Sequence, residues 1–261
     1  MSVPIVLFAI LLLLMIAVGG EKGAKSFFSL IFNFIALFIL LWLITLGFDP
    51  IKAMVFGCII ISSITLFYIN GVNKKTVSSL FAVIVVVLIT MLLTYRIGVN
   101  AKIQGVSKEQ VESVTYLSPY VPLDFSKVII CVVLTGLLGA IIDVSISISS
   151  SMNEIFKNNP AIAKSSLFKS GINIGKDILG TMTNTLLFAY IGGFMTLILW
   201  FNRLNYSIAN IVNAKIFCSE IFQILSSGIG IILIIPATAI ITSMVLFFKG
   251  PSGKEKFKAK A

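Results

Sequence analysis

The feature that most constrains this chain is a series of apolar runs, each about as long as a membrane is thick. A helix needs about 20 residues to cross about 30 Å of hydrocarbon at about 1.5 Å per residue. By that measure the sequence predicts about seven spans, at 2–18, 27–46, 51–69, 77–97, 128–152, 173–200 and 221–248. Lipid cannot satisfy a backbone amide, and the alternation of a barrel strand is missing. We therefore expect an all-α, polytopic transmembrane helical bundle.

Composition narrows the function classes further. Of the 261 residues, 58% are hydrophobic and 11% are charged, whereas in a water-soluble domain roughly a quarter of all residues are charged. The net charge of +10 is scattered along this apolar chain, so we expect the lipid bilayer, and no nucleic acid, as its surroundings. Histidine is absent and the three cysteines lie far apart, which removes His-based catalysis and the common zinc motifs. We expect no enzyme active site, no metal site and no cofactor.

The lysines and arginines predict how the chain crosses the membrane. The loops before the second, fourth and sixth spans, together with the end of the chain, are the richer set. Because such loops stay cytoplasmic, we expect the N-terminus outside and the C-terminus inside. The first run lacks the basic start of a signal peptide, so we expect it to be retained. The chain then reads as one transmembrane domain, 1–248, with a basic cytoplasmic tail, 249–261.

Two of the spans carry polar residues at helical spacing. On the fifth span these are Asp143, Ser147, Ser150 and Glu154. On the sixth the same spacing of 4, 3 and 4 gives Asn173, Asp177, Gly180 and Asn184, with Lys176 on one flank. Each set falls on one narrow face of its helix. The short connection makes the two helices antiparallel neighbours, so we expect one shared polar seam that forms a proton or solute path.

Small residues on the same two helices indicate where they pack. Glycine and alanine let transmembrane helices approach closely, and the candidates are Gly136, Ala140, Gly171, Gly175 and Gly180. Asn159 and Pro160 further predict the start of a short helix on the membrane surface, which Gly171 would end. These positions place the close contacts beside the polar seam.

Asp143 is the residue on which the path depends. An aspartate near the middle of a span costs about 2.5 to 3.5 kcal/mol on insertion scales, so it should face protein or water. One interpretation is a coupling residue that loads and releases a proton. The other is a permanent ion pair, for instance with Lys176, that joins two helices. Glu154, Asp177 and Lys176 lie nearer the interface, where an ordinary solvated role is favoured.

The same region resembles a known family. The matching stretches read Gly139-Ala-Ile-Ile-Asp143-Val, Ser149-Ser-Ser-Met-Asn153-Glu154, and Ser170-Gly-Ile-Asn173-Ile-Gly175-Lys-Asp177-Ile-Leu-Gly180-Thr-Met-Thr-Asn184. They are similar to the YibE/F family of bacterial membrane proteins, in its short YibF-like form. This resemblance implies a multi-pass protein of the bacterial plasma membrane that works beside a YibE-like partner. It implies no chemistry.

Two functions stay open on these grounds. Residues 143–193 also show a fainter similarity to the transmembrane halves of SecD/SecF and RND exporters, which are proton-driven. As an analogy it favours a transporter or permease subunit. The alternative is a scaffold that moves nothing and assembles with a YibE-like protein or as a homo-oligomer.

Overall fold

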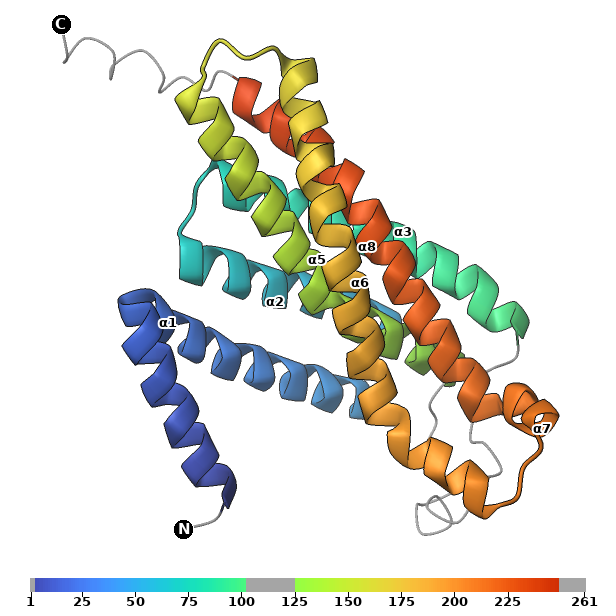
Figure 1. The fold of residues 1–261 in the computed structure, drawn as a ribbon. Coiled ribbons are helices and arrows are strands. Elements are labelled where there is room, and N and C mark those ends of the chain that lie inside the picture. Colours follow the sequence, from blue (N-terminus) through green and yellow to red (C-terminus); the bar gives the residue numbers. More distant parts are fainter. Residues whose placement is uncertain (1–2, 102–124, 249–261) are drawn as a thin grey trace, which may run out of the picture.

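The computed structural model describes residues 3–101 and 125–248, and all regular secondary structure within those ranges is helical. Figure 1 labels the helices: α1 (Val3–Thr45), α2 (Pro50–Ser63) with its π-helical continuation η1 (Ile64–Tyr68), α3 (Lys74–Ala101), α5 (Phe125–Asn158), α6 (Lys164–Arg203), α7 (Ile208–Asn213) and α8 (Lys215–Phe247). Six helices, with α2 and η1 taken together, are long and apolar enough to cross a membrane. This confirms the expected all-α bundle. The predicted basic tail lies outside the described residues.

The first two expected spans are the two arms of one helix, α1. Its 43 residues bend at Gly20, where φ is 56° and ψ is −135°, a conformation that residues with a Cβ disfavour. Figure 1 shows the two blue arms diverging in a V from this bend. The arms touch through the rings of Phe8 and Phe27, with centroids 4.8 Å apart, and a Cβ at Gly23 would collide with the Met15 carbonyl. Two of the predicted spans therefore belong to a single bent helix.

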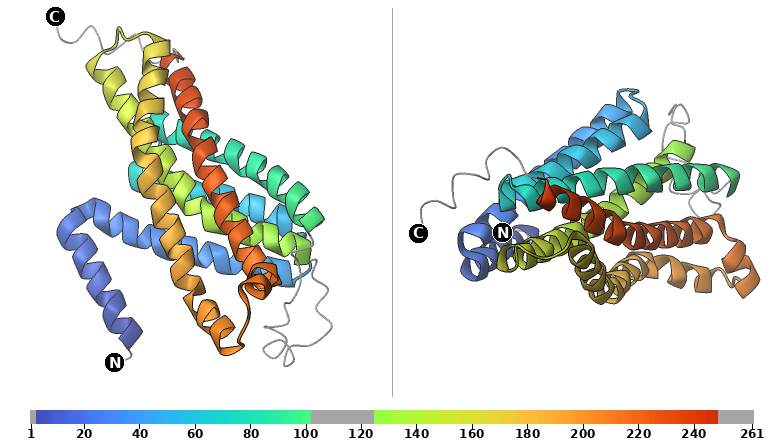
Figure 2. Two further views of the ribbon diagram at one scale, coloured as in Figure 1. Left: turned by 45° about the vertical axis from the view of Figure 1, so that its right-hand side comes forward. Right: turned by 90° about the horizontal axis from the view of Figure 1, so that it is seen from above.

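Helices α3, α5 and α8 form the centre of the bundle (Figure 2). Their buried faces meet in an apolar core that includes Leu134, Leu137 and Ile141 of α5 and Ile231 and Ile234 of α8, all with no exposed surface. Such close packing of aliphatic side chains is the main attraction between helices once they are in lipid. By contrast, the most apolar stretch of α1 has none of its residues buried. Helix α5 has neighbours on most sides: α2, α3, α6 and α8.

Helix α6 packs against the bundle through glycines. A Cβ at Gly171 would press on the Met152 sulfur of α5 and on Ala239 of α8, and a Cβ at Gly175 would collide with Ile235 of α8. The expectation that Gly171 ends a short surface helix is wrong, because α6 runs unbroken from Lys164 to Arg203. Glycine is tolerated inside this helix because it lets the neighbouring helices come close.

Candidate functional site

The most deeply buried polar groups of the bundle are hydroxyls, and they join its three central helices. The Ser79 and Ser149 hydroxyls hydrogen bond across α3 and α5 at 2.6 Å. Ser145 donates to the Ser79 carbonyl at 3.3 Å, and Thr238 of α8 donates to Ser145 at 3.1 Å. A further bond of 3.1 Å runs from Thr242 to Ser78. All six of these side chains are fully buried.

This hydroxyl network contains no group that changes charge near neutral pH. Its hydroxyls satisfy one another or a backbone carbonyl, as buried polar groups in lipid must. We therefore assign it to holding α3, α5 and α8 in register. The sequence contained a signal for it, since Ser145 and Ser149, like Thr238 and Thr242, lie four residues apart, which puts small hydroxyls on one face of each helix. Ser147 and Ser150, the serines predicted to line the path, are instead only partly buried.

The polar face of α6 points away from the bundle. Asn173, Asp177, Gly180 and Asn184 are all exposed, as is Lys176. They lie about half a turn around the helix from the packed Gly171 and Gly175, at about 100° per residue. Between the described residues, no hydrogen bond or ion pair joins this face to the polar residues of α5. This corrects the expectation that the two stripes face each other. Spacing shows which residues share a face, whereas the contacts of Gly171 and Gly175 decide which face turns inward.

The remaining predicted positions are spread over α5 and its neighbours. Glu154 is exposed near the end of α5 and pairs with Lys157 at 3.0 Å. Gly136 lies where a Cβ would collide with the Tyr190 hydroxyl of α6 and approach Gln223 of α8. Ala140 packs against the core, and Gly180 has open space around its Cα. The exposed Glu154–Lys157 pair fits the solvated role that the sequence favoured, and a place for Glu154 in a path stays a prediction.

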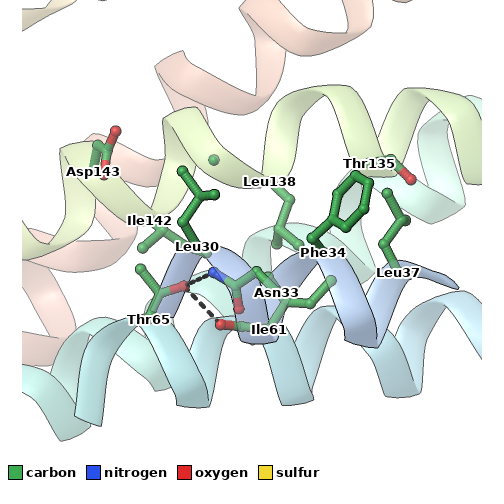
Figure 3. Close-up of a pocket in the computed structure, with 11 residues that line it drawn as sticks. Leu30, Asn33, Phe34, Leu37, Ile61, Thr65, Thr135, Leu138, Ile142 and Asp143 are labelled. Carbon is green, nitrogen blue, oxygen red and sulfur yellow. Dashed lines mark hydrogen bonds between the residues drawn. The ribbon is translucent and has the colours of Figure 1, made fainter. Parts of the chain in front are cut away.

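Asp143 is exposed and lines a cleft between α5 and the second arm of α1. The cleft has a volume of about 350 Å³, and Ile61 of α2 and Thr65 of η1 line its far side. Figure 3 shows Asp143 at one end and Thr135 at the other, with the Asn33–Thr65 pair on the opposite wall. The rest of the wall is apolar, and its lining includes Leu30, Phe34, Leu37, Ile61, Leu138 and Ile142. No residue of α6 takes part.

Asp143 has no counter-ion in the part of the chain that the structure describes. The ion pairs found there are Lys25–Glu21, Lys127–Asp49 and Lys157–Glu154. The alternative pairing of Asp143 with Lys176 is not among them. Asp143 lies close to the middle of the apolar stretch Lys127–Asn158. Ionisable groups at that depth are expensive in lipid and usually mark functional positions.

The opposite wall of the cleft holds polar atoms that the spacing of polar residues did not indicate. Asn33 Nδ2 donates to Thr65 Oγ1 at 2.8 Å, and Thr65 in turn donates to the Ile61 carbonyl at 2.8 Å. Asn33 Oδ1 is buried and has no hydrogen-bond partner among the described residues. Thr65 lies in η1, and short π-helical turns occur often at functional sites. An asparagine within a run of Phe, Leu and Ile was the signal available in the sequence.

A second cavity continues the cleft toward the other end of α5. It measures about 510 Å³ and shares Leu37 and Thr135 with the first. Its walls come from α1, α2, α5 and α8, and its polar lining includes Thr45 and Gln223. Together the two cavities form one groove along α5, and among the described residues that line it Asp143 is the single charged one. The groove is lined mainly by apolar side chains, with the Asp143 carboxyl at one end.

The residues described by the structure include no cluster of three His, Cys, Asp or Glu side chains that would hold a metal ion. Among known proteins, a family model described as YibE/F-like protein matches residues 7–247. No curated protein and no solved structure matches the chain.

Proposed function

This chain belongs to the YibE/F family, and from that premise we propose that it is a transporter or permease subunit of the bacterial plasma membrane with Asp143 as its protonatable site. The observation that carries the proposal is a carboxyl group within an apolar span, beside a groove, without a counter-ion among the described residues. A structural acid in lipid needs a permanent partner. A coupling acid must be able to lose and regain its proton.

For proton transport, the Asp143 carboxyl must change its charge when its surroundings change. When water reaches the groove, Asp143 is stable as a carboxylate; when the groove is closed to water, the neutral acid is favoured because burial disfavours charge. A proton that binds from one side and leaves to the other is then carried across with each cycle of opening and closing. Asn33 and Thr65 supply polar atoms on the opposite wall for a solute or for water. We place the path along α1 and α5 rather than between α5 and α6.

The scaffold remains the second candidate, and the outward polar face of α6 favours it. A protein that only assembles with a YibE-like partner needs such a face and has no need of an unpaired acid in a groove. The two functions therefore depend on different residues. Substitutions at Asp143 and on α6 can separate them.

Proton flux in reconstituted vesicles tests the transporter. The full chain, alone and with a YibE-like partner, is reconstituted with a pH-sensitive dye inside, and a pH gradient is imposed. We expect Asp143→Asn to lower the flux to that of protein-free vesicles, because the amide cannot ionise, and Asp143→Glu to retain part of it. The control is Glu21→Gln, which neutralises an exposed carboxyl paired with Lys25 at the turn of α1.

Two results would count against the proposal. Flux that persists in Asp143→Asn means that Asp143 carries no proton. If the native protein conducts nothing under either condition yet assembles with its partner, the scaffold is the better account. Equal membrane content of all variants, measured on the same preparations, ensures that a loss of flux does not come from failed insertion.

A further inference from the structure

The outward face of α6 lies at the depth of the membrane interior. Gly171 and Gly175 of α6 contact Ala239 and Ile235 of α8, and further along, the Phe194 and Phe217 rings meet with centroids 5.9 Å apart. The two helices are therefore antiparallel, and the stretch of α6 from 175 to 194 lies alongside 217–235 of α8. That stretch of α8 belongs to one of the most apolar spans.

Polar residues at that depth face no other part of the chain within the residues that the structure describes. Asp177, Gly180 and Asn184 lie within the stretch, Asn173 lies just before it, and all four are exposed. Only 11% of the most apolar window of α6 is buried, and Figure 2 shows α6 along one edge of the bundle. Charged and amide side chains within spans almost always face protein or a water-filled cavity. In the membrane this face must therefore meet either another protein surface or a water-filled cavity.

We propose that the covering surface is the same face of a second copy of this chain. The spacing of 4, 3 and 4 between Asn173, Asp177, Gly180 and Asn184 is the spacing of a coiled-coil seam. Two copies cross the membrane in the same direction, so a two-fold axis along the membrane normal pairs α6 with α6 in parallel. Each residue of the seam then meets its own counterpart at the same depth.

The chemistry of the face matches itself. An asparagine amide both donates and accepts, so Asn173 and Asn184 can each pair with their counterpart. The two Asp177 carboxylates face each other across the axis. Lys176 lies beside Asp177 on the flank of the seam, where each lysine can pair with the carboxylate of the other copy and offset this like-charge contact. Gly180 has open space where a Cβ would lie, which permits close approach of the two backbones. The proposal does not depend on transport.

Disulfide crosslinking in membranes tests the geometry. In a Cys218→Ser background, which leaves the buried Cys58 and Cys131 in place, Asn184→Cys is compared with Ala189→Cys. Ala189 is also exposed on α6 but lies about 140° away around the helix, at about 100° per residue. We expect mild oxidation to give a disulfide-linked dimer with Asn184→Cys and none with Ala189→Cys. Equal crosslinking at both positions, or none at either, overturns the proposal.

Swapping the charges of Lys176 and Asp177 tests whether the two faces pair with each other. The mass of the full chain in detergent should be about twice 28.3 kDa. Lys176→Glu and Asp177→Lys should each shift it to the monomer, because each places like charges together, and the double variant Lys176→Glu/Asp177→Lys should restore the dimer. Gly180→Leu should also give monomers without loss of fold. A native monomer, or a stoichiometric complex with a different membrane protein through this face, overturns the assignment to a second copy.

Discussion

Asp49 is a residue with two separate stabilising roles. Its carboxylate caps α2 by accepting from the Ile51 and Lys52 amides, and it binds Lys127 of α5 at 2.6 Å. The hydrogen bond from Lys127 holds the pKa of the Asp49 carboxyl below its ordinary value, and the Lys52 and Ile51 amides add to this, although partial burial opposes them. One side chain thus fixes the start of α2 against the start of α5, beside the larger cavity.

Acid should weaken this contact in a way that substitution can isolate. Because the pKa of Asp49 is lower in the folded chain than its unfolded value of about 3.9, its contribution to stability is present above about pH 4 and is lost as the pH falls through the folded pKa. Asp49→Asn keeps the cap, since asparagine caps as well as aspartate, but loses the ion pair. We expect a cost of about 0.5 to 1 kcal/mol at neutral pH, as for a partly exposed pair.

Thermal unfolding in detergent, followed from about pH 7 to pH 3, measures this effect. The native protein should lose more stability on acidification than Asp49→Asn, so the difference between the two should shrink as the pH falls. Comparing the two slopes cancels the titration of all other carboxyl groups. Parallel slopes would show that the Lys127 pair contributes nothing to stability.

At the scale of whole elements, the hydroxyl network sets how α3 meets α5. Ser79 and Ser149 contribute one hydroxyl each to the bond between these helices. We expect Ser79→Ala and Ser149→Ala each to lower the free energy of unfolding. The coupling in a double-mutant cycle should be about 0.6 kcal/mol, with about 1.7 kcal/mol as the upper end found for bonds between transmembrane helices.

A second double-mutant cycle, in which Ser219 replaces Ser79, provides the control. Ser219 of α8 bonds to the Ile216 carbonyl of its own helix, so Ser219→Ala combined with Ser149→Ala should show additive effects. Unfolding in mixed detergent gives all the free energies. A coupling of zero between Ser79 and Ser149 would mean that the network is a consequence of packing and contributes nothing of its own.

Elements and their partners were not equally predictable from the sequence. Apolar length gave the helices, because any segment that crosses lipid must be apolar and helical. Periodicity also placed Asn173, Asp177 and Asn184 correctly on one face. It did not give the direction of that face, which depends on where Gly175 meets Ile235. The bend of α1 at Gly20 was missed because a glycine between two apolar runs fits a loop as well as a bend.

At the scale of the whole molecule, the contacts sort the helix ends into two groups. Lys74 Nζ donates to the Leu246 and Phe248 carbonyls at 3.4 and 3.1 Å, and the Phe156 and Phe247 rings are 5.2 Å apart. The start of α3 and the ends of α5 and α8 therefore lie together. Asp49 and Lys127 join the starts of α2 and α5 elsewhere. Consecutive spans cross a membrane in opposite directions, which requires the start of α3 and the ends of α5 and α8 to lie on one side and the starts of α2 and α5 on the other. The contacts agree with this requirement.

Which group faces the cytoplasm stays a prediction, and labelling of introduced cysteines checks it. The group that contains Lys74 and Lys157 is the richer in lysine and should lie inside. In the Cys218→Ser background we expect a membrane-impermeant maleimide to label Phe48→Cys and Leu204→Cys in intact cells, because both positions are exposed at the other group. Val72→Cys and Asn159→Cys should react only after the cells are opened. The reverse pattern would invert the topology, and Asp143 would then be approached from the opposite compartment, although the groove beside it would be unchanged.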